Sequence, residues 1–214
     1  MVSPVSVVPI GTAEELIAVL RPHDVRWQPY PWEWLFRGQW DSLFELLPSA
    51  YRARSWQQFA APGELPFDPI AGYQSQVVQA QHEYKALNTF LADIDRAGLD
   101  IPNEVFVREG FKGESGNDLE FVLQPAISTF TALAQHHGIP TRLLDWTRVG
   151  IHAAYFAAAE AALSATSTGT LSVWALSTAF VEHVEALQSQ TSLLQFAPHL
   201  SLITAPRASN PTLS

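Results

Sequence analysis

The chain has 214 residues, of which 47% are hydrophobic and 15% charged, a composition that can bury a core and that excludes wholesale disorder. It contains no cysteine, so disulfides, thiolate nucleophiles, zinc fingers and iron–sulfur clusters are all excluded. The formal net charge of −9 argues against strong sequence-independent binding to duplex DNA, because phosphate neutralisation supplies most of that affinity.

Neither a secretory leader nor a membrane span is expected. Residues 1–11 lack a basic start and an apolar run of leader length. The longest apolar stretch, residues 150–163, is interrupted by His152 and Glu160 and is shorter than the roughly 20 residues that a span needs. We therefore expect a soluble, cytoplasmic protein with no membrane partner.

The first elements are predicted from a cap and from aromatic residues. Thr12 and Glu15 have the spacing of a capping box, which predicts a short helix over residues 12–20. The bulky residues 34–36 favour a strand that ends at Arg37–Gly38, which puts Arg37 at the strand end.

The middle of the chain is predicted to be mostly helical. Residues 48–51 begin a short helical turn, and residues 61–72, with three prolines and two glycines, form a loop. Apolar residues recur at three- and four-residue steps over 74–94, which predicts an amphipathic helix. The polar, glycine-rich residues 108–120 suggest a mobile loop, and a helix over 125–137 begins at a proline and precedes Gly138.

The last third alternates between short strands and helices. We expect a strand over 141–146, a buried alanine-rich helix over 150–164 and a strand over 170–176. A further helix over 178–189 and a polar tail over 201–214 complete the chain. There is no internal repeat, and the fold class is α+β.

The common catalytic motifs are missing from the sequence. It has no G-x-G-x-x-G, no Walker loop and no H-E-x-x-H, and residues 113–116 lack the spacing of a nucleophile elbow. Two polar clusters remain as candidate sites.

The first cluster is residues 36–39. Gly38 would let the backbone approach a ligand closely, and Arg37 could hold a diphosphate with two hydrogen bonds. Ten of the 12 basic residues are arginines, which suits a local anion site. The alternative is that Arg37 pairs with a carboxylate such as Asp41 and only stabilises the fold.

The second cluster is residues 135–147, where a helix end, a sharp turn and a short extended segment bring polar side chains together. The alternative to a site is that Arg142 pairs with Asp145 while His136 caps helix carbonyls. A metal site would need ligands from elsewhere, since His136 and His137 are adjacent on a helix and point in different directions. No metal is expected.

Aromatic residues are concentrated near the first cluster. Exposed members could stack on a nicotinamide, an adenine or an unpaired base, whereas buried members would belong to the core, which we expect for most of them. Five of the seven tryptophans lie in this segment: Trp27, Trp32, Trp34, Trp40 and Trp56.

The two clusters together resemble the FRG domain family. The resemblance rests on Phe36-Arg37-Gly38, on the segment Leu47 to Arg52, and on the segment Gln135 to Thr147 that follows about ninety residues later. It extends over roughly residues 30–180 and includes the helix with Tyr155 and Phe156 and the strand around Trp174. It implies an N-terminal helix and lead-in over 1–29, the domain over 30–200 and a polar tail over 201–214.

The chain differs from the family at two places. His137 stands where the family usually has an aromatic residue such as tyrosine. The substitution is compatible with the family if the ring at this position has only a stacking role. Family members continue beyond a segment like 206–211 into a glutamine- and glycine-rich strand, so we expect this chain to be truncated at Ser214. The catalytic carboxylate is then expected at Asp145, Glu160 or Glu83, or beyond the end of the chain.

The family is similar to NAD-dependent ADP-ribosyltransferases, which implies a split β-sheet core with surrounding helices and NAD⁺ as co-substrate. The resemblance implies a nucleic-acid base as acceptor, with adenine in unpaired or single-stranded DNA as the specific candidate. A toxin or defence effector is implied, with an antitoxin or a reversing hydrolase as a further partner. The catalytic residues would be Arg37, Thr141, Asp145 and His136, and the NAD⁺-binding residues Arg37, Gly38, Gln39, Arg52, Thr141 and Arg142.

Two other functions remain open at this point. The fold could serve as a non-catalytic module that binds a nucleotide or a peptide. Alternatively, His136, His137 and Asp145 could belong to a metal-dependent nuclease, which a chelator would inactivate. The proposal of a transferase depends on Arg37 and the segment after Pro140 meeting around one dinucleotide.

Overall fold

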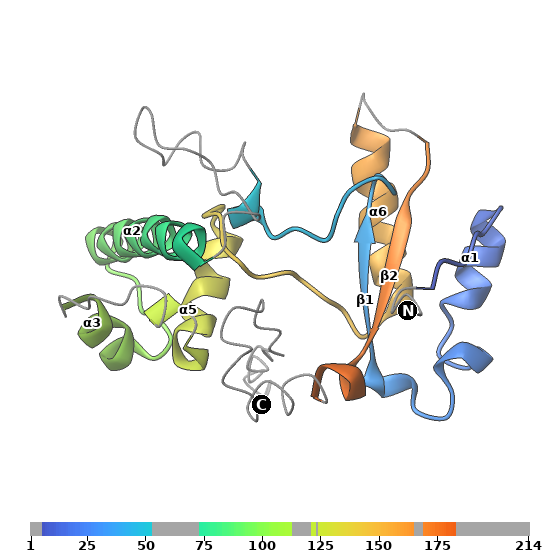
Figure 1. The fold of residues 1–214 in the computed structure, drawn as a ribbon, viewed down its shortest axis with the longest axis horizontal. Helices are drawn as coiled ribbons and strands as arrows, with labels where there is room; N and C mark the ends of the chain where they lie inside the picture. The colour runs from blue at the N-terminus through green and yellow to red at the C-terminus, as the bar shows by residue number, and fades with distance from the viewer. Residues whose placement is uncertain (1–5, 53–72, 113–120, 123, 165–168, 183–214) are drawn as a thin grey trace, which may run out of the picture. The chain divides into compact units, whose positions relative to one another are not determined.

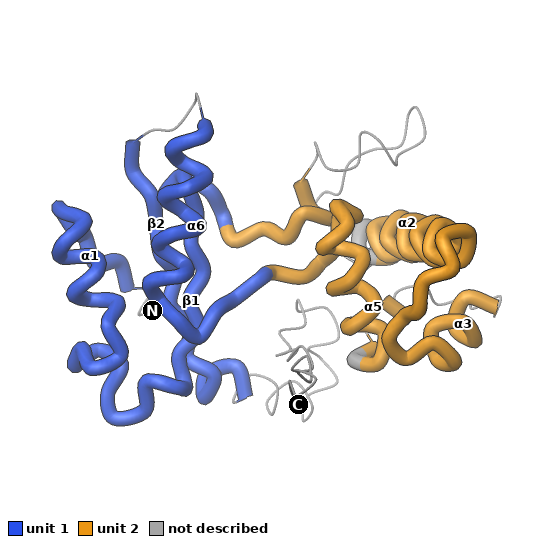
Figure 2. The backbone as a smooth tube through the Cα atoms, turned by 180° about the vertical axis from the view of Figure 1, so that it is seen from behind, with its two compact units in different colours: residues 1–45, 145–184 blue, residues 46–144, 185–214 orange. Residues whose placement is uncertain are grey.

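A computed structural model describes residues 6–52, 73–112, 121–122, 124–164 and 169–182. The chain forms two compact units, each described here by itself (Figure 2). Unit 1 comprises residues 1–45 and 145–184, and unit 2 comprises residues 46–144 and 185–214. The boundaries of the units fall inside the block 30–200 that the sequence suggests as one domain.

Unit 1 is built on two antiparallel strands with a helix beside them (Figure 1). Strand β1 (Trp34–Gln39) pairs with β2 (Ser172–Ser177), with Arg37 opposite Trp174. Helix α6 (Gly150–Leu163) packs against both strands. Both strands are therefore confirmed, but Arg37 lies within β1 rather than at its end.

The start of unit 1 is a helix whose cap the sequence specifies. Helix α1 (Ala13–Val19) begins after Thr12, which accepts a hydrogen bond from the backbone N–H of Glu15 at 3.2 Å. The Glu15 carboxylate accepts in return from the backbone N–H of Thr12 at 3.3 Å. This reciprocal pair is the expected capping box.

Aromatic rings form the core of unit 1. The Trp27 ring meets the rings of Trp34 and Phe36 edge-on at centroid distances of 5.2 and 5.0 Å. The Trp27 indole N–H donates to the carbonyl of Val19 at 2.7 Å. The core role is confirmed for Trp27, whereas Trp32 is exposed and Trp56 lies outside the described residues.

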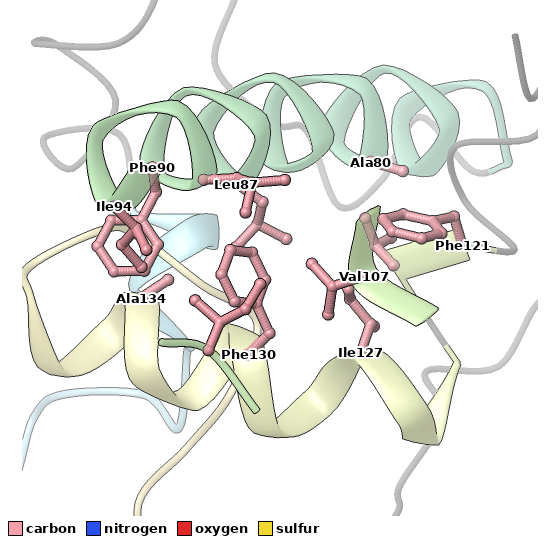
Figure 3. Close-up of a cluster of buried hydrophobic side chains, with 12 residues drawn as sticks. Ala80, Leu87, Phe90, Ile94, Val107, Phe121, Ile127, Phe130 and Ala134 are labelled. Atoms are coloured by element: carbon pink, nitrogen blue, oxygen red, sulfur yellow. The ribbon is translucent and has the colours of Figure 1, made fainter. Parts of the chain in front are cut away.

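Unit 2 is helical in its described part. Helix α2 (Tyr73–Ala97), α3 (Glu104–Lys112) and α5 (Pro125–His136) enclose an apolar core to which all three contribute (Figure 3). Short 3₁₀ turns occur in both units, over Val25–Trp27 and Pro31–Glu33 in unit 1 and over Ser49–Tyr51 in unit 2. The core of unit 2 includes Leu87, Phe90, Ile94, Val107, Ile127 and Phe130.

Helix α5 ends where its glycine predicts. Gly138 has φ +86°, which glycine adopts without strain. The N–H of Gly138 donates to Gln135 at 2.9 Å and that of Ile139 to Ala134 at 3.0 Å, the two hydrogen bonds of a Schellman motif. The chain therefore leaves the helix at a fixed angle toward Thr141.

Three expectations about local structure are wrong. Residues 108–112 continue helix α3 instead of forming a loop, while 113–120 lie outside the described residues. Residues 141–146 are not a strand, because the segment pairs with β1 only through a bridge between Thr147 and Phe36. Helix α6 buries Gly150, Ala153 and Ala157 but exposes most of its other side chains.

The remaining expectations fall partly on residues that are not described. Residues 178–182 are helical, as expected for the start of the helix over 178–189. The loop over 61–72 and the tail over 201–214 lie outside the described ranges. Helices together with a small antiparallel sheet agree with the α+β class. Within those ranges, the helices are all too short or too polar to span a bilayer.

Candidate functional site

In unit 1, a hydrogen bond joins Arg37 of the first cluster to Asp145 of the second. The Arg37 guanidinium donates through Nη1 to the backbone carbonyl of Asp145 at 2.8 Å. Thr147 is fixed beside β1, because its N–H and carbonyl both bond to Phe36, at 2.8 and 2.7 Å. Asp145 itself is exposed. An arginine and a carboxylate from distant parts of the sequence therefore share one framework.

Gly38 allows the strand to approach helix α6. A Cβ on Gly38 would lie 2.0 Å from the carbonyl oxygen of Ala153 and 2.9 Å from the Cβ of Ala157. Both distances are shorter than any real contact of this kind. The sequence suggested that Gly38 lets a ligand come close to the backbone. In the structure, helix α6 occupies that position instead.

Gln39 is buried and both ends of its amide are bonded within unit 1. Its Nε2 donates to the carbonyl of Glu45 at 3.0 Å, and its Oε1 accepts from the indole N–H of Trp174 at 2.6 Å. This side chain therefore ties the end of β1 to β2 and to the segment that follows β1. The sequence interpretation of Gln39 as an NAD⁺ contact did not include that structural role.

In unit 2, Thr141 points inward. Its side chain is 1% exposed, and its hydroxyl bonds to the side-chain oxygen of Gln135. The same hydroxyl accepts from the backbone N–H of Leu143 at 3.3 Å. The expected ribose-facing hydroxyl is thus engaged with its own motif.

Thr141 also holds the segment 47–52, whose sequence contributes to the family resemblance. The Ser49 hydroxyl accepts from the N–H of Thr141 at 3.0 Å, and the N–H of Ala50 donates to the Thr141 carbonyl at 2.9 Å. Arg52 is exposed and donates through Nε and Nη2 to the carbonyl of Leu47 at 3.0 and 2.8 Å. The segments 47–52 and 135–147, which carry the family resemblance, are therefore joined by hydrogen bonds.

Arg142 forms a buried ion pair with Glu83 of helix α2. Its Nε and Nη2 donate to the two carboxylate oxygens at 2.7 and 3.0 Å, and the side chains are only 14% and 3% exposed. The alternative in which Arg142 pairs with Asp145 is wrong, because Glu83 is the partner. Burial opposes the charge of Arg142, yet the pKa of this guanidinium is raised because the Glu83 carboxylate more than offsets that effect.

The ion pair is part of a larger buried network. Gln79 lies one turn before Glu83 and donates through Nε2 to Glu83 at 3.1 Å and to the carbonyl of Ala50 at 2.7 Å. Burial raises the pKa of the nearby Tyr51 phenol, with Arg142 lowering it and Glu83 raising it to a smaller extent. Tyr51 is therefore held in its protonated form at neutral pH.

The two histidines differ in what they contact. The His137 ring packs against the Phe90 ring at a centroid distance of 5.5 Å, with the planes tilted by 39°. His136 is the last residue of α5 and is exposed. Among the residues that the structure describes, no three His, Asp or Glu side chains converge as metal ligands.

Sequence reasoning missed the role of Gln79 and identified Glu83 only as a catalytic candidate. Their signal is a polar pair four residues apart on a helix whose neighbouring positions, Ala80 and Leu87, are buried. A buried carboxylate needs a cationic partner, which would have directed attention to an arginine. The sequence does not identify which arginine.

Residues 32–166 match the FRG domain, a match that covers 135 of the 214 residues and both polar clusters. The chain belongs to the FRG domain family. Helix α1 and strand β2 lie outside the residues that match the FRG domain. A search of curated proteins and a search of solved structures returned no match.

Proposed function

We propose that this FRG domain protein is an ADP-ribosyltransferase that moves ADP-ribose from NAD⁺ to a nucleic-acid base, with adenine in unpaired DNA as the first candidate. The observation that carries the proposal is the hydrogen bond between Arg37 and the carbonyl of Asp145. That bond joins Arg37, the proposed ligand of the diphosphate, to the backbone of Asp145, the proposed catalytic carboxylate. The resemblance of FRG domains to NAD-dependent ADP-ribosyltransferases supports it.

Arg37 would hold the diphosphate of NAD⁺. A guanidinium has five N–H donors, and the carbonyl of Asp145 accepts from Nη1. Position 37 lies within the hydrogen-bonded strand β1, so the backbone that carries the guanidinium is rigid. A fixed planar fork binds a diphosphate with less loss of entropy than a flexible lysine would.

Asp145 would stabilise the positive charge that develops on the ribose. When the bond between the ribosyl C1′ and nicotinamide breaks, nicotinamide leaves with the electron pair and C1′ becomes oxocarbenium-like. A nitrogen of the acceptor base then bonds to C1′ and releases its proton. A nearby carboxylate lowers the energy of that transition state. Asp145 is the candidate for this role because its side chain is exposed and its backbone carbonyl accepts a hydrogen bond from Arg37, the proposed diphosphate ligand.

The second cluster would contribute mainly by holding its own shape. Thr141 could contact the ribose only if its hydroxyl broke the hydrogen bond with Gln135. Arg142 could contact the diphosphate only if its guanidinium broke the ion pair with Glu83. His136 is exposed and is the candidate that positions a ribose hydroxyl or the acceptor amine. Arg52, also exposed, is a further candidate for the diphosphate.

The proposed acceptor and biological role agree with the charge of the chain. An unpaired base costs no flipping energy, so a protein with a net charge of −9 can act on it without gripping duplex phosphates. We propose a cytoplasmic toxin or defence effector, with an antitoxin or a reversing hydrolase as partner. Strands β1 and β2 would belong to the split sheet of the transferase core.

A non-catalytic nucleotide- or peptide-binding module is the second candidate. It is favoured by the bonded state of Gln39, Thr141 and Arg142, whose side chains all have partners inside the protein. Such a module would bind NAD⁺ through Arg37 without breaking it. Calorimetric binding of NAD⁺ together with no product in any acceptor would favour this candidate.

The test uses NAD⁺ labelled in its adenylate half. The protein is incubated with the labelled NAD⁺ and, in separate tubes, with single-stranded DNA, duplex DNA, RNA and a protein mixture. We expect label in the single-stranded DNA and its loss in Arg37→Ala. The matched control is Arg96→Ala, since Arg96 is an exposed arginine that forms a salt bridge with Asp93 on the same helix. Transfer that survives in Arg37→Ala would overturn the proposal.

A further inference from the structure

Two aromatic side chains on the surface of unit 1 have no part in its core. Trp32 is 61% exposed and Tyr30 is 50% exposed, and their rings touch with centroids 5.4 Å apart and planes at 55°. Large exposed aromatic pairs are unusual outside binding surfaces, because burial would stabilise the fold more. The contrast with Trp27, which is buried in the same segment, shows that the segment can bury such a ring.

A cation is fixed at the same place. The Arg148 guanidinium donates through Nη1 to the backbone carbonyl of Trp32. Arg148 is exposed, and a guanidinium has five N–H donors, of which this bond uses one. An exposed aromatic face with an arginine beside it combines the two groups that hold a nucleotide, one for the base and one for the phosphate.

The ring pair and Arg148 share the framework that carries Arg37 and Asp145. Arg148 directly follows Thr147. Two backbone hydrogen bonds with Phe36 hold Thr147 beside β1. The segment 145–148 therefore runs along β1 with Asp145 at Arg37 and Arg148 at Trp32. At one end of the segment, the Arg37 side chain bonds to the backbone of Asp145. At the other end, the Arg148 side chain bonds to the backbone of Trp32, which lies in the turn just before β1.

We propose that Tyr30, Trp32 and Arg148 form a stacking site for unpaired bases of a single-stranded nucleic acid, with Arg148 on a flanking phosphate. Two rings tilted at 55° offer two successive faces, which suits neighbouring bases of a strand better than the single adenine of a dinucleotide. This inference rests on the proposed function for its purpose, since the strand would supply the acceptor base. Its test measures binding alone.

The experiment measures the fluorescence anisotropy of a labelled 12-nucleotide deoxyadenylate strand with the whole chain and without NAD⁺. We expect Trp32→Ala to weaken binding about 5- to 100-fold, the effect of losing one stacked base. Trp32→Phe keeps a ring and should recover most of the affinity. Arg148→Ala should reduce the salt dependence by a slope of about 0.7, the value for one phosphate of a single strand.

The matched control is Tyr155→Ala on helix α6. Tyr155 is 66% exposed and its ring touches that of Phe156, at a centroid distance of 5.7 Å, but it belongs to neither polar cluster. Equal weakening by Tyr155→Ala and Trp32→Ala would show that any exposed ring gives the effect and would overturn the proposal. No binding by wild type, equal binding of duplex, or a Trp32→Ala effect on NAD⁺ affinity but not on the strand would also overturn it.

The outcomes separate this inference from the proposed function. Strand binding that depends on Trp32, in a protein that never consumes NAD⁺, would support the stacking site and contradict the transferase. Consumption of NAD⁺ with strand binding that does not depend on Trp32 would contradict the stacking site alone.

Discussion

Arg37 and Asp145 are 108 residues apart in the sequence and meet through a hydrogen bond from a guanidinium to a main-chain carbonyl. Because the bond uses the backbone of Asp145, the carboxylate can be changed without removing it. Variants of the Asp145 side chain therefore test the proposed chemistry with this backbone contact in place.

Asp145→Asn should leave the fold intact and reduce catalysis. The amide has nearly the same shape as the carboxylate, and the Arg37 hydrogen bond does not involve it. We expect the free energy of unfolding to change by no more than about 0.5 kcal/mol, as for other exposed positions. Loss of the negative charge should slow nicotinamide release by about 100-fold or more. An unchanged rate would remove Asp145 from the proposed mechanism.

Gly38→Ala should destabilise unit 1. The new methyl group would have to displace the backbone of helix α6 at Ala153 or move the strand. We expect a loss of about 1–3 kcal/mol in chemical denaturation, the range for overpacked sites. Gly11→Ala is the control, because its Cβ would meet only the Glu15 carboxylate at an ordinary 3.6 Å. Equal stability of the two variants would show that α6 does not pack this closely on β1.

Breaking the ion pair of Arg142 and Glu83 should cost more than replacing it. Glu83→Leu or Arg142→Met alone leaves a buried charge without its partner, and we expect a loss of about 3–5 kcal/mol. Glu83→Leu combined with Arg142→Met removes both charges and should be less destabilising than the sum of the single changes. Simple additivity in this double-mutant cycle would mean that the two side chains do not interact.

Stability should decline in alkaline solution because of Tyr51. Its folded-state pKa is raised above the ordinary value of 10.0, chiefly by burial, so the native protein holds this proton more tightly than the unfolded chain. The associated stability is complete below pH 10 and is lost as the pH rises through the folded-state value. Tyr51→Phe should flatten the dependence of the unfolding free energy on pH above 10. A slope unchanged in that variant would assign the effect to other groups.

The features predicted correctly are those that depend on neighbouring residues. Thr12 and Glu15 determine the start of α1 through hydrogen bonds three residues apart. Gly138 determines the end of α5, because only its own conformation and the preceding turn are involved. The α+β class follows because such local signals give the type of most elements.

The features that could not be predicted depend on partners far away in the sequence. Glu83 lies 59 residues from Arg142, and the nearer Asp145 was the more obvious partner. The pattern around Gly38 does not distinguish a ligand from helix α6 as the group that comes close. Residues 141–146 have the composition of a strand, but within the described ranges no strand pairs with them along their length.

The most direct test of the transferase is the intact mass of a single-stranded oligonucleotide after incubation with the protein and NAD⁺. We predict a gain of one ADP-ribose for each modified base, with one nicotinamide released per transfer, and neither change with Arg37→Ala. An oligonucleotide of unchanged mass and NAD⁺ left whole, with NAD⁺ binding still measurable by calorimetry, would contradict the transferase and favour the binding module.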